Sequence, residues 1–276
     1  MEGRYRAGQL DRKTRVYGII GDPVGHSLSP AMHNAAFQAR RMNAVYVPFL
    51  VRDLRDFIAA IAPLGVAGFS VTIPHKQAIV RYLDRCDPTA AEIGAVNTVA
   101  VRAGKLVGYN TDHIGVLRAL EQRMRVRTSR VLIVGAGGGA RAAAFALAGS
   151  GASVFITARR MRRAAELANA VGGEAIEHRE LRHRHFDAVV NATPVGMHPF
   201  IEASPLAASD LNCRVVFDMI YRPRETRLLR LAARRGIKTI SGIEMLVAQG
   251  FAQWEIWTGR RAPENVMQQA AIRSLE

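Results

Sequence analysis

The chain has 276 residues, of which 49% are apolar and 22% charged, and its formal net charge at pH 7 is +15. This composition excludes a disordered or collagen-like chain, and no apolar run approaches the roughly 20 residues that a membrane helix needs. The polar N-terminal stretch lacks the apolar core of a secretory signal. Because Cys86 and Cys213 stand far apart without a CxxC pattern, we expect a reducing, cytoplasmic location.

The net charge has two interpretations. A strongly basic chain can bind nucleic acid, or its field can steer small anions. The arginines are spread along the chain without interleaved aromatic residues, which favours a solvated surface with anion steering. Lysine is rare, with only Lys13, Lys76, Lys105 and Lys238. A lysine in such a chain hints that a site needs a compact ammonium, which can release a proton whereas an arginine effectively cannot.

The first part of the chain alternates β-branched runs with helical stretches, which predicts an α/β fold. Strands are expected over residues 16–20, 45–50 and 68–73, helices over 30–41, 52–62 and 111–124, and a hairpin over 96–107. Ser29 is expected to cap the first helix, with Pro30 at its first position. The polar stretch at residues 125–130 then marks a domain boundary.

A second alternating series follows this boundary. Strands are expected over residues 131–134, 154–157, 188–191, 215–218 and 237–240, with helices between them and two more over 245–257 and 263–275. This order predicts three parts: an N-terminal α/β domain over 1–124, a nucleotide-binding α/β domain over 125–241, and C-terminal helices over 242–276 that return to the first domain.

A glycine-rich segment links the first strand and helix of the second series. The pattern Gly135-x-Gly137-x-x-Ala140 is the dinucleotide-binding fingerprint in its required context. The first glycine allows a tight turn, the second lets the backbone approach a pyrophosphate, and the helix N-terminus holds the negative charge. The candidate phosphate-binding residues are Gly135, Ala136, Gly137, Gly138 and Gly139. A flexible turn is the alternative, but the flanking strand and helix favour a nucleotide.

The end of the next strand indicates which nucleotide is bound. An NAD site would place an acidic residue there, to accept from the ribose 2′-hydroxyl. The chain instead has Ala158, Arg159 and Arg160. An arginine can pair with a 2′-phosphate, so we predict NADP, chiefly from Arg159. The alternative is that these arginines only form the basic start of a solvated helix.

Polar residues in the first part suggest a substrate site. Ser27 and Ser29 stand at a helix start, where hydroxyls and backbone donors suit a carboxylate, although a turn and a cap explain them equally well. Thr72 and Lys76 follow a strand end, where Lys76 could also be a surface lysine.

Two further residues in this part are ambiguous. Asn97 lies in a β-branched run and would need partners if buried, or it could face water on an edge strand. Asp112 precedes a helix and could be a first-turn carboxylate that the helix dipole favours. His26, His75 and His113 show no metal-ligand spacing, so we assign no metal.

With these residues in view, the chain resembles the shikimate dehydrogenase family over nearly its full length. The resemblance rests on eight motifs in the family's order, at residues 21–34, 71–76, 94–98, 108–112, 135–139, 191–197, 218–221 and 242–249. It implies a fold with an N-terminal α/β substrate domain, a Rossmann domain and a returning C-terminal helix. It also implies NADPH-dependent reduction of 3-dehydroshikimate to shikimate in aromatic amino-acid biosynthesis.

The resemblance also implies roles for individual residues. Lys76 and Asp112 would be the catalytic pair. The substrate would be held by Ser27, Ser29, Thr72, Asn97, Tyr221 and Gln249. Thr193, Met219 and Gly242 would lie near the cofactor. The chain departs from common family residues at Ser70, His113 and Ala158, none of which is a proposed catalytic group.

Two alternatives stay open at this point. A quinate or quinate/shikimate dehydrogenase that uses NAD would share the scaffold, but Arg159 and the two serines argue against it. A ligand-sensing or nucleic-acid-binding protein would fit the net charge, but the Lys76 and Asp112 pair argues against it. We expect a small-molecule substrate, with neither nucleic acid nor a membrane as partner, and leave a homodimer open.

Overall fold

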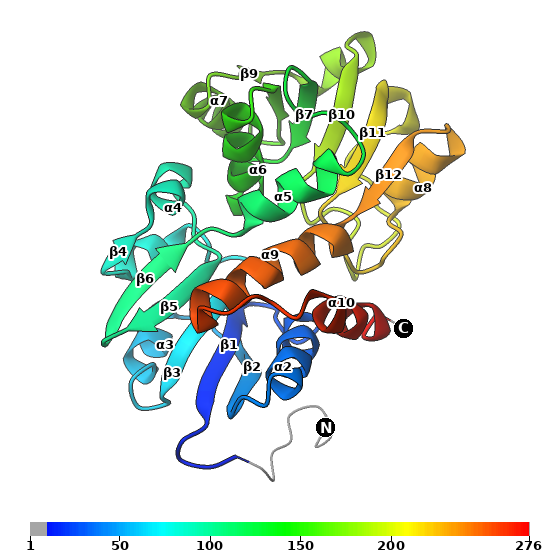
Figure 1. Ribbon diagram of the computed structural model, residues 1–276. Helices are drawn as coiled ribbons and strands as arrows, with labels where there is room; N and C mark the ends of the chain where they lie inside the picture. The colour runs from blue at the N-terminus through cyan, green and yellow to red at the C-terminus, as the bar shows by residue number, and fades with distance from the viewer. Residues whose placement is uncertain (1–9, 276) are drawn as a thin grey trace. The chain divides into compact units, whose positions relative to one another are not determined.

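The computed structural model describes residues 10–275, which form two compact units (Figure 1). The first unit combines the residues up to Thr111 with those from Gln249, and the second is Asp112–Ala248. The chain thus passes from one compact unit to the other after Thr111 and again after Ala248. The reason is packing: Leu120 of α5 (Asp112–Glu121) and Met245 of α9 (Gly242–Thr258) are buried in the core of the second unit.

The first unit contains a mixed six-stranded sheet in the order β2-β1-β3-β5-β6-β4. The strands are β1 (Arg15–Gly21), β2 (Ala44–Leu50), β3 (Val66–Val71), β4 (Arg85–Cys86), β5 (Thr98–Arg102) and β6 (Lys105–Tyr109). β1, β2 and β3 are parallel, and β5 runs antiparallel to both β3 and β6. The helices of this unit are α2 (Ser29–Ala39), α3 (Leu54–Ala60), the 3-10 helix η2 (Ala78–Tyr82), α4 (Pro88–Ile93), the later part of α9, and α10 (Glu264–Arg273).

Aromatic side chains fill the core of the first unit between the sheet and its helices. Phe57 of α3 meets Phe69 of β3 edge to face, with ring centroids 5.0 Å apart. Trp257 of α9 donates from its indole nitrogen to the carbonyl oxygen of Val99, at 3.0 Å. A Cβ on Gly68 would lie only 2.6 Å from that indole nitrogen, so the close approach of α9 requires glycine there.

The second unit contains a sheet in which all pairings are parallel, in the order β12-β11-β10-β7-β8-β9. Its strands are β7 (Arg130–Val134), β8 (Ser153–Thr157), β9 (Glu174–Ala175), β10 (Phe186–Asn191), β11 (Cys213–Asp218) and β12 (Lys238–Ser241). Its helices are α5, α6 (Gly138–Gly149), α7 (Met161–Ala170), the 3-10 helices η3 (His178–His183) and η4 (Ala208–Asp210), α8 (Arg227–Arg234) and the start of α9. This is the doubly wound, Rossmann-type arrangement that the strand and helix alternation predicts.

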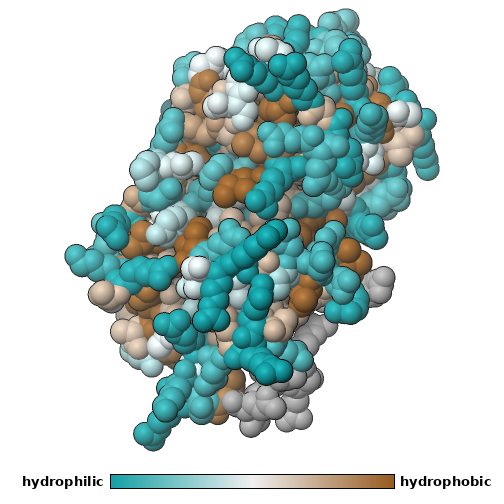
Figure 2. Space-filling model, in the orientation of Figure 1, coloured by the Kyte–Doolittle hydropathy of each residue, from teal (hydrophilic) through white to brown (hydrophobic). Residues whose placement is uncertain are grey.

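The surface is consistent with the composition. Hydrophilic side chains cover much of the face drawn in Figure 2, as the charge of +15 leads one to expect. Over residues 10–275, no helix has both the length and the apolar character that crossing a membrane requires.

Candidate active site

Polar residues that the sequence assigns to a substrate gather at one edge of the first unit's sheet. Because β5 is antiparallel to β3, the start of β5 lies beside the end of β3. Thr72 follows β3, Asn97 precedes β5, and Thr111 lies just beyond β6. The backbone fixes this arrangement, since the Val71 nitrogen donates to the Asn97 carbonyl at 2.8 Å and the Asn97 nitrogen donates to the Tyr109 carbonyl at 3.1 Å.

Asn97 is the centre of a buried polar network. Its side-chain oxygen accepts from the backbone nitrogen of Thr111 at 2.7 Å and from the hydroxyl of Thr98 at 2.8 Å. Its amide nitrogen donates to the Thr111 hydroxyl at 2.9 Å and to the side-chain oxygen of Gln249 at 3.2 Å. Asn97 is only 2% exposed. The alternative of an edge-strand amide facing water is therefore wrong, and Gln249 joins the same network from α9.

The segment that carries the two serines is attached to the same edge. The Thr72 nitrogen donates to the Ile20 carbonyl at 2.9 Å, and the Asp22 nitrogen donates to the Ile73 carbonyl at 3.0 Å. A Cβ on Gly21 would lie 2.4 Å from the methyl carbon of Thr72, so glycine is needed for this approach. The segment that follows β1 thus starts next to Thr72.

The prediction that Ser29 caps α2 is wrong. The helix begins at Ser29 itself, its N-cap is Leu28, and Leu28 makes no side-chain cap hydrogen bond. The hydroxyl oxygen of Ser27 instead accepts from the Ser29 nitrogen at 3.2 Å. Ser27 is half-buried and Ser29 is buried at the positive end of the helix dipole. Both hydroxyls therefore stand where a carboxylate would be stabilised.

The predicted catalytic residues are held by segments on either side of Asn97. Lys76 is half-buried between β3 and η2, and its carbonyl accepts from the Val96 nitrogen at 2.8 Å. Asp112 is buried as the first residue of α5 and directly follows Thr111, which is bonded to Asn97. Val96 bonds the backbone of Lys76, and its neighbour Asn97 bonds the backbone of Thr111, the residue before Asp112. Two consecutive residues therefore hold both segments.

A second buried network, which the sequence alone did not reveal, supports the first. The Tyr46 hydroxyl donates to the Ser70 hydroxyl at 2.7 Å, and Ser70 donates to the side-chain oxygen of Gln253 at 3.0 Å. Gln253 in turn donates to the Thr98 hydroxyl at 3.0 Å. A hydroxyl suits this position because Ser70 both accepts a hydrogen bond from Tyr46 and donates one to Gln253. The only sequence signal was the polar residue within a buried strand.

The glycine-rich segment of the second unit has the geometry that the fingerprint predicts. It follows β7 and leads into α6, whose N-cap is Gly137. Gly135 has a φ of +121°, a conformation that favours glycine, and its nitrogen donates to the Thr157 carbonyl at 2.8 Å. A Cβ on Gly137 would meet nothing within 4 Å, so the backbone there is open to a ligand. Both features fit a bound pyrophosphate.

The end of β8 presents arginines beside this segment. Arg159 and Arg160 are exposed and Ala158 is half-buried, and all three lie between β8 and α7. Because β7 and β8 are adjacent and parallel, these residues lie at the same edge as the glycine segment. Their charge and position fit a 2′-phosphate.

Thr193 is oriented by a buried network that was likewise not predicted. The Asn191 side-chain oxygen accepts from the Thr193 hydroxyl at 2.7 Å, and the Asn191 amide donates to Asp218 at 3.0 Å. The Thr226 hydroxyl donates to the other Asp218 oxygen at 2.6 Å. Asp218 is fully buried, and burial raises its pKa to about 6. The sequence signal for this network was that two predicted strands end in polar residues, Asn191 and Asp218.

Met219, Gly242 and Tyr221 complete the predicted set. The methyl carbon of Met219 would lie 3.2 Å from a Cβ on Gly139, so Met219 contacts the glycine segment. A Cβ on Gly242 would lie 2.4 Å from the Met219 carbonyl oxygen, which explains the glycine at the start of α9. Tyr221 is half-buried in the loop between β11 and α8. Met219 follows β11 and Gly242 follows β12, so both lie at the carboxyl ends of the strands, as does the glycine segment after β7. Open parallel sheets bind ligands at these ends.

Comparison with known proteins agrees with this geometry. The chain matches the profiles described as shikimate dehydrogenase substrate binding domain over residues 19–99, shikimate / quinate 5-dehydrogenase over 118–227, and shikimate 5′-dehydrogenase C-terminal domain over 242–272. It is 46% identical over 280 residues to a protein of Symbiobacterium thermophilum named shikimate dehydrogenase (NADP(+)), with 95% of each chain covered.

Solved structures show the same similarity. A shikimate dehydrogenase in complex with NADP+ has a TM-score of 0.90 and 41% identity, with 97% of this chain and 98% of that chain covered. A shikimate 5-dehydrogenase of Thermus thermophilus in complex with NADP(H) and shikimate has a TM-score of 0.88 and 36% identity, with 95% and 100% covered. The chain therefore belongs to the shikimate dehydrogenase family.

Proposed function

We propose that this chain catalyses the reversible, NADPH-dependent reduction of 3-dehydroshikimate to shikimate, in the cytoplasm and as a step of aromatic amino-acid biosynthesis. The observation that carries the proposal is the Asn97 network, which gathers hydroxyl and amide groups at one sheet edge next to the segments of Lys76 and Asp112. The names of the relatives support the same reaction.

The substrate is a ring that carries a carboxylate and several hydroxyls. Ser27 and Ser29 are proposed to hold the carboxylate at the start of α2, helped by Tyr221. Thr72, Asn97 and Gln249 are proposed to hold the ring hydroxyls. Amide groups suit this task because each can donate and accept, and those of Asn97 and Gln249 are oriented by their mutual hydrogen bond. A ring hydroxyl that binds Asn97 would replace one of the present partners of its amide, which already makes two donor and two acceptor bonds. A pre-oriented site loses less freedom when the substrate binds.

Lys76 is proposed as the proton donor. The substrate oxygen gains negative charge as the ketone is reduced, and a nearby ammonium both stabilises that charge and supplies the proton that the product hydroxyl needs. Asp112 would orient the ammonium and accept from a ring hydroxyl. In the reverse direction the same lysine would take the proton back. The backbone bonds around Val96 and Asn97 hold the segments of both residues in place.

The cofactor is proposed to be NADP. The open backbone at Gly137 and the left-handed Gly135 would accommodate the pyrophosphate, and Arg159 and Arg160 the 2′-phosphate. Thr193, Met219 and Gly242 would lie on the nicotinamide side. When bound, the reduced cofactor supplies the hydride. The chain's own contribution there is to fix the orientation, through the Asn191 bonds to Thr193 and Asp218.

The proposal is tested by following NADPH absorbance with 3-dehydroshikimate as substrate. The native chain should consume NADPH, and the Lys76→Ala variant should turn over about 10²- to 10⁴-fold more slowly while binding NADPH as before. NADPH binding is measured by its fluorescence. Lys105→Ala is the matched control, because Lys105 is exposed in the β5–β6 hairpin.

Two outcomes distinguish the proposed reaction from the proposed role of Lys76. A native chain that consumes no NADPH in the presence of 3-dehydroshikimate would contradict the reaction itself. An active native chain whose Lys76→Ala variant retains full turnover would leave the reaction standing and remove Lys76 from the role of proton donor.

A further inference from the structure

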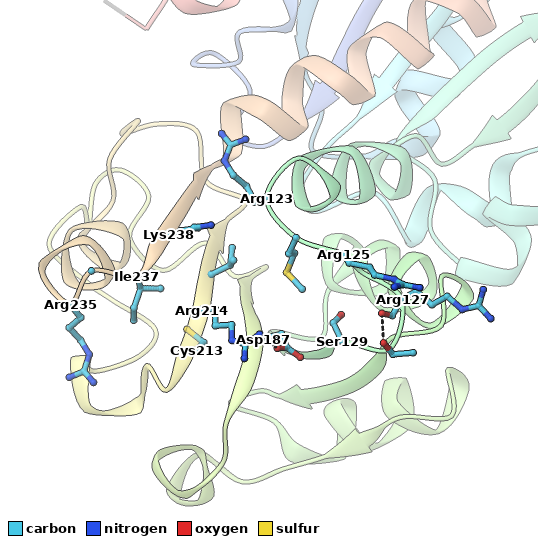
Figure 3. A pocket seen from close by; sticks show the side chains of 14 residues that line it. Arg123, Arg125, Arg127, Ser129, Asp187, Cys213, Arg214, Arg235, Ile237 and Lys238 are labelled. Carbon is cyan, nitrogen blue, oxygen red and sulfur yellow. Dashed lines mark hydrogen bonds and ion pairs between the residues drawn. The ribbon is translucent and has the colours of Figure 1, made fainter.

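The second unit has a pocket of about 810 Å³ on a part of the molecule that the proposed reaction does not use (Figure 3). The pocket is formed by the segment before β7, the starts of β10 and β11, and the segment before β12. Its basic lining residues are Arg123, Arg125, Arg127, Arg214, Arg235 and Lys238, and its one acidic lining residue is Asp187.

Most of this positive charge is not neutralised within the protein. Arg123 is paired with Glu244 at 3.3 Å, and Arg214 with Asp187 at 3.5 Å. Within residues 10–275, no ion pair forms on the four other basic lining residues, which are Arg125, Arg127, Arg235 and Lys238. The pocket therefore has a strongly positive potential that an anion would relieve.

The basic side chains stand on opposite sides of the pocket. In Figure 3, Lys238 and Arg214 lie on one side, Arg125 and Ser129 lie on the other, and Asp187 lies between them. The walls also include apolar residues, Met124, Val215 and Ile237. Positive charge therefore surrounds the pocket, since Lys238 and Arg214 contribute it on one side and Arg125 on the other. Such an arrangement suits a ligand with several negative oxygens along its length.

The pocket is separate from the proposed cofactor site. All pairings in this sheet are parallel, and the cofactor residues follow the carboxyl ends of its strands, whereas the pocket residues lie at the amino ends. A strand of five residues, such as β7, spans roughly 16 Å. A ligand in the pocket and NADP could therefore be bound at the same time.

We propose that this pocket binds a polyphosphate group, either as free inorganic polyphosphate or as the phosphate chain of a nucleotide. A single phosphate can balance only part of the charge of Arg125, Arg127, Arg235 and Lys238, whereas a chain of phosphates carries several negative charges. Met124 and Ile237, the apolar lining residues that are partly exposed, give a single base a surface to pack on. A nucleic-acid strand is disfavoured because its successive bases stack on aromatic side chains, and none lines the pocket. The inference does not depend on the proposed reaction.

The test is calorimetric titration of the full chain, saturated with NADP+, with inorganic tripolyphosphate at low ionic strength. The double variant Arg125→Gln/Lys238→Gln should bind tripolyphosphate at least about tenfold more weakly than the native chain. The control is Arg55→Gln/Lys105→Gln, which removes the same charges from exposed positions of the first unit and should leave affinity unchanged. Replacing the probe with adenosine triphosphate distinguishes the two sources, because only the nucleotide can gain affinity from the apolar wall.

Several results would overturn the proposal. Equal affinity in the two double variants would show that net charge alone attracts the probe. Tripolyphosphate binding that is seen only when NADP+ is omitted from the titration would assign the probe to the cofactor site. Binding of a single-stranded oligonucleotide in place of tripolyphosphate would replace the proposed ligand by a nucleic acid.

Discussion

Replacing Asp218 with asparagine tests how the buried network behind Thr193 responds to pH. Asp218 is fully buried and its pKa is raised from 3.8 to about 6, because burial disfavours the charged form more than its three hydrogen bonds favour it. The folded state thus binds more protons than the unfolded state between these two values. Stability attributable to this group must therefore fall as pH rises through the window from 3.8 to about 6, and stay level above it.

The shift in pKa sets the size of the effect. One pKa unit corresponds to about 1.4 kcal/mol, so the full window is worth about 3 kcal/mol, and the part between about pH 4.5 and pH 7 is worth about 2 kcal/mol. The asparagine side chain of the variant is neutral at every pH. The native chain should therefore lose about 2 kcal/mol relative to the Asp218→Asn variant over that range.

The assay is urea unfolding of both proteins at several pH values, which yields the difference in unfolding free energy at each. Because every other titrating group is shared, the difference isolates Asp218. A difference that stays constant between about pH 4.5 and pH 7 would refute the reasoning, since it would mean that Asp218 titrates alike in the folded and unfolded states.

Three other predictions follow from single residues. Arg159→Ala should raise the Michaelis constant for NADPH much more than for NADH, and equal effects on both would reject the assignment of Arg159 to the 2′-phosphate. His33 is buried against Tyr46 and its pKa is lowered from 6.5 to about 3, so stability should fall as pH drops below 6.5. Urea unfolding should show that the native chain loses about 2 kcal/mol of unfolding free energy between pH 7 and pH 5, and that the His33→Phe variant does not. The same pH dependence of the unfolding free energy in both proteins would contradict this. Gly242→Ala should lower the unfolding free energy by about 1–3 kcal/mol, because the new Cβ would lie 2.4 Å from the Met219 carbonyl oxygen. Gly149→Ala in α6, where a Cβ meets nothing within 4 Å, should instead be neutral or stabilising, and similar melting temperatures for the two variants would argue against the steric reason.

The longer elements could be predicted because each has a clear local pattern. The β-branched run at residues 131–134 corresponds to β7 (Arg130–Val134), and one of the helices expected between the later strands corresponds to α7 (Met161–Ala170). The two-residue strands β4 and β9 were not predicted, because two residues carry no periodicity. Their pairing depends on neighbouring strands rather than on their own sequence.

The candidate site was only partly predictable for a related reason. The glycine segment could be located because its function lies in consecutive backbone positions. The partners of Asn97 could not, since Gln249 reaches it from α9, far along the chain. The Ser29 cap was wrong because Ser27, two residues earlier, supplies the accepting hydroxyl. The buried position of Asp218 depends on strand order, which determines that β10 lies beside β11.

The most direct test of the proposed function compares four pairings in one spectrophotometric assay: shikimate or quinate, each with NADP+ or NAD+. Reduction of the cofactor should be fastest with shikimate and NADP+, and both the change to quinate and the change to NAD+ should lower kcat/KM. A preference for quinate with NAD+, or no cofactor reduction with any of the four pairings, would contradict it.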